Sequence, residues 1–551
     1  MMMRNAQHNS TGNATNLLIF LLIVLSVWVL FFKLGSPNFY DIRLESRRAE
    51  IARNMLETGN WIVPQLSGET KLTKPPLYFW AVALCSLKTT VNEFTARFPS
   101  AIFGVGTVLV TFLLGTLLFT RIIGFIAALM LLVTNIFVSE ARYAEMESML
   151  TFFITAALFC FLKGYYDSKR DTVWFTIFFI LMSLGTMTKG PFAFTFPLIP
   201  IIAHLFIHNE QKLLIKKSFL SGMKFFFIFL LPWVLVILWM YPKFALVVIG
   251  ETVARFYTEG YGHIEPFYFY VGAMVTTMFP WIFFLPLSLW IAFSDRLRSV
   301  RKENVFLILW IFGNLLFLSF SKVKRDFYLT PLAPAVALLI GSTWEEIWNW
   351  LGEIMHYNKV NLQRVCFIAG ALLAGIAFIA GNPFAVNFPG KRLPDISSFL
   401  LFAGLCCMLV SLSRALMPSS VSAAKTALVA IAALVLASQY LYLTFTIPIK
   451  NAYDSGAYFY KALPELVKSE VPLAFFGTYD NYAMSFYAHR PVIYLTTKDT
   501  VLPYMAAREK RYLVLSEKFL DKFPDALWKV KFKGMYSEHT SWGGYMLVCN
   551  Q

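Results

Sequence analysis

Long apolar runs, each close to the length of a membrane-crossing helix, dominate this sequence. A helix needs about 20 apolar residues to cross the hydrocarbon core of a bilayer. Runs of that length recur through most of the chain, and 58% of its 551 residues are hydrophobic while only 15% are charged. A water-soluble fold leaves much of its surface exposed and could not hide so much apolar area. The sequence therefore predicts an all-α polytopic membrane protein.

The length criterion predicts about thirteen transmembrane spans. The first run is longer than the core of a signal peptide and lacks a small-residue cleavage site, so we expect it to stay as a helix. The spans are expected at residues 16–35, 95–119, 122–139, 147–165, 172–188, 190–208, 220–241, 267–293, 304–320, 327–344, 365–382, 397–413 and 425–447.

Basic residues gather in alternate connections, as at Arg121, 163–170 and 212–217. Basic connections stay in the cytoplasm. We therefore expect a multi-pass membrane protein with its N-terminus in the cytoplasm and its C-terminal tail on the outer side. Topology also accounts for the net charge of +16. We therefore expect membrane lipid as a partner and expect no binding of nucleic acid.

Two regions differ from the apolar spans. Residues 45–56 have helical spacing and residues 77–87 are amphipathic, which predicts interfacial helices in the first outer loop. The tail alternates helix-like stretches with short β-type runs at residues 472–476, 492–496, 512–515 and 545–548. We therefore expect a transmembrane domain over 1–447 and a small α/β domain over 448–551 on the outer side.

Charged residues on the predicted outer side come from segments far apart in the sequence. Ionisable groups at membrane depth usually have a function or a partner. Lys and Arg can hold the phosphate of an activated lipid, and a carboxylate can take a proton from an attacking hydroxyl. The candidates are Asp41, Glu45, Arg47, Lys74, Arg142, Glu147, Lys189, Glu259, His263, Glu265, Lys322, Lys324, Arg325 and Tyr328.

A series of motifs extends over about residues 16–345. In order they are LESRRAEIARNMLETGNWIVPQ, KLTKPPLYFW, ARYAEMESM, TKG, GHIEPFYFYV and SFSKVKRDFYLTPLAP. Together they resemble the lipid A aminoarabinose transferase family, which belongs to the polyprenyl-phosphate-dependent membrane glycosyltransferases of the GT-C type and is related to the protein O-mannosyltransferases. The resemblance implies inverting transfer of a sugar, such as aminoarabinose, from undecaprenyl phosphate to lipid A or another envelope glycan. It also implies that the protein lies in the bacterial cytoplasmic (inner) membrane, with the reaction and the C-terminal domain on the periplasmic side.

The resemblance also implies which residues bind the lipid phosphate. Lys74 matches the lysine of the family's Lys-Pro motif, although a snorkelling interface lysine would look the same. Lys322 and Lys324 match a later basic pair. Lys189, at a helix end, would equally well offset the helix dipole. The candidate phosphate ligands are Lys74, Lys189, Lys322, Lys324, Arg325 and Tyr328.

The candidate catalytic carboxylates are Glu45, Asp41 and Glu147. The family's usual aspartate before Glu45 is Leu44 here, and Asp41 lies one helical turn before Glu45. Either carboxylate is expected to assist the nucleophile, whereas the structural alternative for Glu45 is a cap or an ion pair. Glu147 stands where the family has an aspartate.

No cofactor is firmly expected. Glu259, His263 and Glu265 would suit a weak divalent-metal site, although such a histidine is more often structural. Arg47 and Arg142 complete the outer candidates. The rival functions are a protein O-mannosyltransferase, a non-catalytic scaffold, and a transporter or flippase of lipid-linked sugars, which would need mid-membrane charges and broken helices that the sequence does not indicate.

Overall fold

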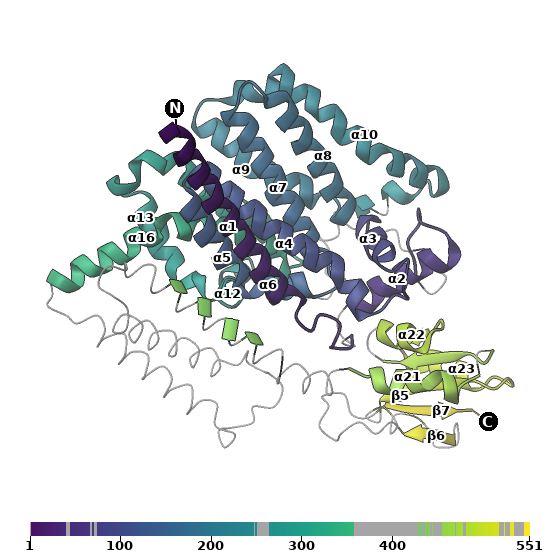
Figure 1. The fold of residues 1–551 in the computed structure, drawn as a ribbon. Helices are drawn as coiled ribbons and strands as arrows, with labels where there is room; N and C mark the ends of the chain where they lie inside the picture. Colours follow the sequence, from purple (N-terminus) through teal and green to yellow (C-terminus); the bar gives the residue numbers. More distant parts are fainter. Residues whose placement is uncertain are drawn as a thin grey trace.

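The computed structural model shows a bundle of helices with a mixed β-sheet near the C-terminal end (Figure 1). It describes residues 2–39, 44–66, 69–70, 74–246, 248–250, 264–357, 455–468, 470–477, 481–516, 529–533 and 545–550, together with Phe519, Phe523 and isolated residues between 428 and 444.

Six helical segments in this described part are long and apolar enough to cross a membrane. They are α4 (Glu93–Leu118), α7 (Glu147–Tyr166), α8 (Asp171–Lys189), α10 (Lys217–Met240), Asp295–Phe320 and Asp326–Trp350. Two shorter apolar helices accompany them, Thr15–Phe31 within α1 (Met2–Phe31) and α9 (Phe192–Ile207). The predicted spans at 365–382 and 397–413, and most of 425–447, lie outside the described residues.

Two predicted spans are broken rather than continuous, which corrects the sequence-based expectation. The first consists of α5 (Arg121–Leu132) and α6 (Asn135–Arg142), bent by 64°. The second consists of α12 (Phe269–Thr277) and the stretch Trp281–Ala292, bent by 116°. If each bent pair is counted as one span, the described residues contain up to eight candidate spans.

The two breaks meet and satisfy each other's backbone groups. The backbone N–H of Asn135 donates to the carbonyl of Phe279 at 3.1 Å, and its side-chain amide donates to the carbonyl of Thr276 at 3.0 Å. The indole of Trp281 donates to the carbonyl of Met130 at 2.7 Å. A broken helix at membrane depth is tolerated where other groups bond the freed backbone, which explains why the breaks are paired.

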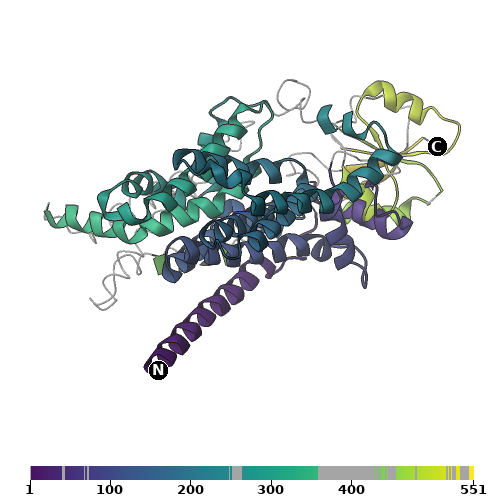
Figure 2. The same ribbon diagram turned by 90° about the horizontal axis from the view of Figure 1, so that it is seen from above.

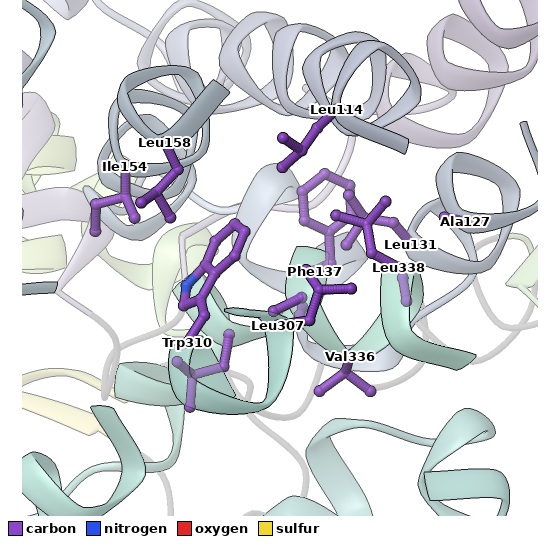
Figure 3. Close-up of a cluster of buried hydrophobic side chains, with 14 of the residues drawn as sticks. Leu114, Ala127, Leu131, Phe137, Ile154, Leu158, Leu307, Trp310, Val336 and Leu338 are labelled. Carbon is purple, nitrogen blue, oxygen red and sulfur yellow. The ribbon is translucent and has the colours of Figure 1, made fainter. Parts of the chain in front are cut away.

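The helices pack around a continuous apolar core. Figure 3 shows Trp310 beside Phe137, with leucines of α4, α5, α7 and α14 (Arg301–Ile308) around them. Glycines allow α4 and α5 to cross closely, because a Cβ on Gly124 would lie 2.4 Å from the carbonyl oxygen of Phe112. Close approach at small residues is typical of membrane helix packing.

The first outer loop contains both predicted interfacial helices, α2 (Glu45–Thr58) and α3 (Leu77–Cys85). Between them lies a two-stranded antiparallel pair, β1 (Gln65–Leu66) and β2 (Glu69–Thr70). The indoles of Trp80 and Trp233 donate to the carbonyls of Trp61 and Ile62. The loop is thereby tied to itself and to α10.

The C-terminal region forms a five-stranded sheet in the order β4-β3-β5-β7-β6. Strands β3 (Leu473–Phe476), β4 (Ile493–Leu495) and β5 (Tyr512–Ser516) are parallel, and β7 (Tyr545–Cys549) is antiparallel to β5. The helices are α21 (Ala457–Leu466), α22 (Tyr482–Ala488) and α23 (Lys498–Met505). All four predicted β-type runs are strands here, whereas the predicted boundary at 447/448 lies outside the described residues.

One strand was not predicted, β6 (Lys529–Lys533). It is the edge strand of the sheet and pairs antiparallel with β7. Its sequence, KVKFK, alternates lysine with Val530 and Phe532, which is the period-2 pattern of a half-buried strand. The signal was present, but three lysines lower the hydropathy of so short a run.

Candidate active site

An ion pair between Glu147 and Lys189 lies where three distant segments meet. Glu147 is the first residue of α7, Lys189 is the last residue of α8, and Tyr328 lies in the 3-10 helix η5 (Asp326–Leu332). The ammonium group of Lys189 contacts Glu147 and lies 4.7 Å from the ring centroid of Tyr328. The structure therefore brings together three residues that the sequence had nominated separately.

Local sequence explains why this pair forms. A carboxylate is favoured at a helix N-terminus and a cation at a helix C-terminus. Gly190 follows Lys189 with φ +84, a conformation that glycine adopts without a side-chain clash, so α8 ends at the lysine. The TKG motif is thus a helix terminus that presents an ammonium group.

A small pocket opens beside this pair. Glu147, Lys189 and Tyr328 are among the residues that line it. Its other walls are apolar and come from Leu150, Phe192, Phe196, Phe327 and Pro331. The charged pair therefore borders a small, mainly apolar pocket.

A second ion pair extends the charged network toward the first outer loop. Arg48 of α2 pairs with Glu145, which lies just before α7. Burial opposes the charge on Arg48, but Glu145 and Glu147 together outweigh burial, so the pKa of this guanidinium is raised. Arg48 therefore stays charged and faces the carboxylates at the start of α7.

Glu45 is fully buried and engaged by other groups. Its two carboxylate oxygens accept from Arg97 at 2.8 and 3.1 Å, and Oε1 also accepts from the backbone N–H of Ala144 at 2.9 Å. Arg97 also donates to the carbonyls of Leu34 and Pro37. This arrangement matches the structural alternative for Glu45, an ion pair that ties α2 to α4.

Arg97 was not among the predicted site residues. The signal that could have found it is a charge inside the predicted span 95–119, since such charges usually have a partner. Its partner Glu45 lies 52 positions earlier in the sequence, and residue spacing alone does not predict a contact over that separation.

The later basic residues lie on the strand-like connection before η5. The ammonium group of Lys324 is buried and donates to the carbonyls of Glu265, at 3.0 Å, and Ser321. Burial lowers the pKa of Lys324, and Glu265 partly offsets this effect. Lys322 is exposed, and Arg325 directly precedes η5. The two lysines therefore differ, one turned inward and one outward.

The other nominated residues that the structure describes come from three further segments. Lys74 stands three residues before α3, which packs near the end of α8. Arg47 lies 5.6 Å from the ring of Tyr482, and Arg142 donates to the carbonyls of Val29 and Phe32 at the end of α1.

Three nominated residues, Asp41, Glu259 and His263, lie outside the described residues. Glu265 is described, but its carbonyl serves Lys324. Within the described ranges, no group of three or more metal-ligating side chains occurs. The suggested metal site is therefore untested.

Comparison with known proteins gives a consistent result. The family model for dolichyl-phosphate-mannose-protein mannosyltransferases matches residues 21–248. An uncharacterized protein of Aquifex aeolicus is 32% identical over 58% of this chain and 62% of its own length. The undecaprenyl phosphate-alpha-4-amino-4-deoxy-L-arabinose arabinosyl transferase of Pectobacterium atrosepticum is 27% identical over 65% of each chain. The chain thus spans less than two thirds of these curated relatives.

Solved structures show the fold. The crystal structure of ArnT from Cupriavidus metallidurans bound to undecaprenyl phosphate aligns with a TM-score of 0.76 at 16% identity, covering 97% of this chain and 98% of that chain. An oligosaccharyltransferase of Archaeoglobus fulgidus aligns with a TM-score of 0.52 at 13% identity, over 92% of this chain and 70% of that chain. The chain therefore has the fold of ArnT, and its sequence resembles the aminoarabinose transferases and, more distantly, the protein O-mannosyltransferases.

Proposed function

We propose that this protein is a membrane glycosyltransferase that moves a sugar from undecaprenyl phosphate to lipid A or another envelope glycan at the periplasmic face of the inner membrane. The observation that carries the proposal is the Glu147–Lys189 pair beside Tyr328 at an apolar pocket. The ArnT fold and the names of the curated relatives support a polyprenyl-phosphate donor, and aminoarabinose is the first sugar to test.

The proposed reaction is a single displacement at the anomeric carbon. An oxygen of the acceptor forms the new bond to this carbon, and the bond to the lipid phosphate oxygen breaks with its electron pair. Undecaprenyl phosphate leaves as an anion, so cations near it lower the barrier. Lys189, together with the exposed Lys322 and with Lys74, would supply these cations in the proposed site.

Glu147 is the carboxylate that suits the acceptor best among those described. One oxygen of Glu147 contacts Lys189, while Oε2 has no hydrogen-bond partner within the described residues. An oxygen in this state can accept a proton from an acceptor hydroxyl, or orient an acceptor phosphate that is already ionised. Both oxygens of Glu45, by contrast, are held by Arg97.

A protein O-mannosyltransferase is the second candidate, favoured by the family model that matches residues 21–248. It would use the same displacement with a protein hydroxyl as the nucleophile. In that case Glu147 would act as a general base, because a serine or threonine hydroxyl must lose its proton.

The test is reconstitution of the purified protein in liposomes with undecaprenyl-phosphate aminoarabinose and lipid A. Mass spectrometry of lipid A should show one added sugar with the wild type and none with Glu147→Gln. A glycosylated peptide with unmodified lipid A would favour the second candidate. Movement of the donor between leaflets without any transfer would contradict both and indicate a flippase.

A further inference from the structure

The C-terminal α/β unit contacts the first outer loop through one short helix. Figure 1 shows α22 beside α2, and Figure 2 shows the yellow-green C-terminal unit next to the purple segment that contains α2. The two helices share one buried apolar cluster. The contact joins residues more than 400 positions apart in the sequence. It lies on the helix that also supplies Glu45 and Arg48.

Arg53 of α2 binds the last turn of α22. Its guanidinium donates to the carbonyl of Phe486 at 2.8 Å and to that of Ser485 at 3.4 Å. It also contacts Nδ1 of His489 at 3.0 Å and lies 5.2 Å from the ring centroid of Phe486. The last carbonyls of a helix lack partners within the helix, so a cation there is well placed. Glu50 completes the contact by pairing with Arg53.

Tyr487 joins the same unit to the start of α4. Its hydroxyl accepts from the backbone N–H of Phe39 at 2.8 Å and donates to the carboxylate of Glu93, also at 2.8 Å. Glu93 is the first residue of α4, one helical turn before Arg97. A single buried hydroxyl therefore holds two segments of the membrane domain in place.

Phe39 carries the contact to the buried ion pair. One side of its ring faces Phe486, with centroids 5.1 Å apart, and the guanidinium of Arg97 lies 5.2 Å from its centroid. Arg97 in turn holds both oxygens of Glu45 at the start of α2. A continuous set of contacts thus runs from α22 through Phe39 to Arg97 and Glu45.

We propose that the C-terminal α/β unit positions α2 in the active protein, with Tyr487 and Arg53 as positioning residues. This inference rests on the proposed function, because α2 places Arg48 opposite the carboxylates at the start of α7. Loss of the contact would let α2 shift and would misplace Arg48 and the Glu45–Arg97 pair. Misplacement of about 1 Å at a site is enough to slow a reaction strongly.

The first test compares Tyr487→Phe with Tyr504→Phe in the full-length protein in liposomes. Both variants lose one hydroxyl of a largely buried tyrosine in the same α/β unit, but Tyr504 donates to the carbonyl of Tyr512 and belongs to a buried cluster that contains no residue of α2. We expect Tyr487→Phe to lower kcat about five- to tenfold, with a smaller change in the donor KM. Tyr504→Phe should leave kcat unchanged. Equal kcat in the two variants would overturn the proposal.

The second test measures hydrogen exchange of the backbone amides of α2, which does not depend on activity. Tyr487→Phe and the milder Arg53→Lys should speed this exchange about tenfold, because lysine cannot reach two carbonyls at once. Unchanged exchange in α2 would also overturn the proposal. A wild type that transfers no sugar would contradict the proposed function alone, since the exchange result would still decide whether α22 holds α2.

Discussion

Two buried carboxylate–cation pairs lie near the start of α7, and they differ in how fully the carboxylate oxygens are hydrogen-bonded. Glu45 and Arg97 are 0% and 2% exposed and bind each other through both oxygens, with a backbone N–H as a third donor. Glu147 and Lys189 are 2% and 9% exposed by their side chains, but they line a pocket and Glu147 keeps one oxygen without a hydrogen-bond partner among the described residues. A saturated pair stabilises a fold, whereas an unsaturated pair beside a pocket can exchange partners with a ligand.

Glu45 lies in the first motif, and the sequence alone makes it a candidate for the carboxylate that assists the nucleophile. The geometry favours Glu147 as the carboxylate that acts on the acceptor, and it gives Glu45 a structural role in the ion pair with Arg97. Substitutions at Glu147 and at Arg97 test this division of roles directly.

The largest expected effect is that of Glu147→Gln. The amide keeps the shape of the side chain but cannot accept a proton, so the rate of sugar transfer should fall by about 10²- to 10⁴-fold. Initial rates in liposomes measure it. Glu140→Gln is the control, since Glu140 is also buried nearby but does not line the pocket. A rate within threefold of wild type, on the order of experimental scatter in such assays, would return Glu45 to consideration.

Arg97→Met should mainly reduce stability. It leaves the carboxylate of Glu45 buried without its cation, which costs about 3–5 kcal/mol when a buried pair is broken. Thermal unfolding in detergent should show the loss. The double variant Glu45→Leu/Arg97→Met removes both charges and should recover most of the stability. A single Glu45→Gln variant with normal thermal stability but no transfer would reverse the assignment of the two pairs.

Lys322 and Lys324 should separate into a ligand-binding and a structural role. Lys322→Met removes an exposed cation and should raise the KM for the donor about three- to tenfold, with little change in kcat. Lys324→Met removes bonds to the carbonyls of Glu265 and Ser321 and should instead lower the melting temperature. Kinetics and thermal unfolding on both variants check this, and the opposite pattern would exchange the two roles.

The smallest effect concerns acid stability at the contact between α22 and α2. Partial burial and the neighbouring Arg53 lower the pKa of His489, while Glu57 opposes them. The unfolded state therefore binds the proton more tightly than the folded state does. The contribution of His489 to the stability of the contact is present above its unfolded pKa of about 6.5, and it is lost as pH falls through and below that value. Asparagine tolerates the left-handed backbone conformation of His489 and does not titrate in this range. The His489→Asn variant should therefore flatten the pH dependence of hydrogen exchange in α2 between about pH 7.5 and 5. An unchanged profile would exclude His489 as the cause.

Much of the architecture could be predicted from local pattern. The spans that begin at residues 95, 147, 172 and 220 correspond to α4, α7, α8 and α10, and helices α2 and α3 form where the sequence pattern predicts them. These predictions succeed because hydrophobic length and periodicity are local properties that a bilayer selects directly. The breaks after Leu132 and Thr277 could not be predicted, since they depend on hydrogen bonds between segments about 140 residues apart.

The sequence by itself determined that this is a membrane protein, which residue types are available for chemistry, and which family it resembles. Only the tertiary structure decided how those residues pair: Glu45 with Arg97, Arg48 with Glu145, and Glu147 with Lys189. Spacing specifies which face of a helix a residue occupies, but the partner on another helix depends on how the whole bundle packs. For a buried charge the partner decides whether the group supports the fold or remains available to a substrate.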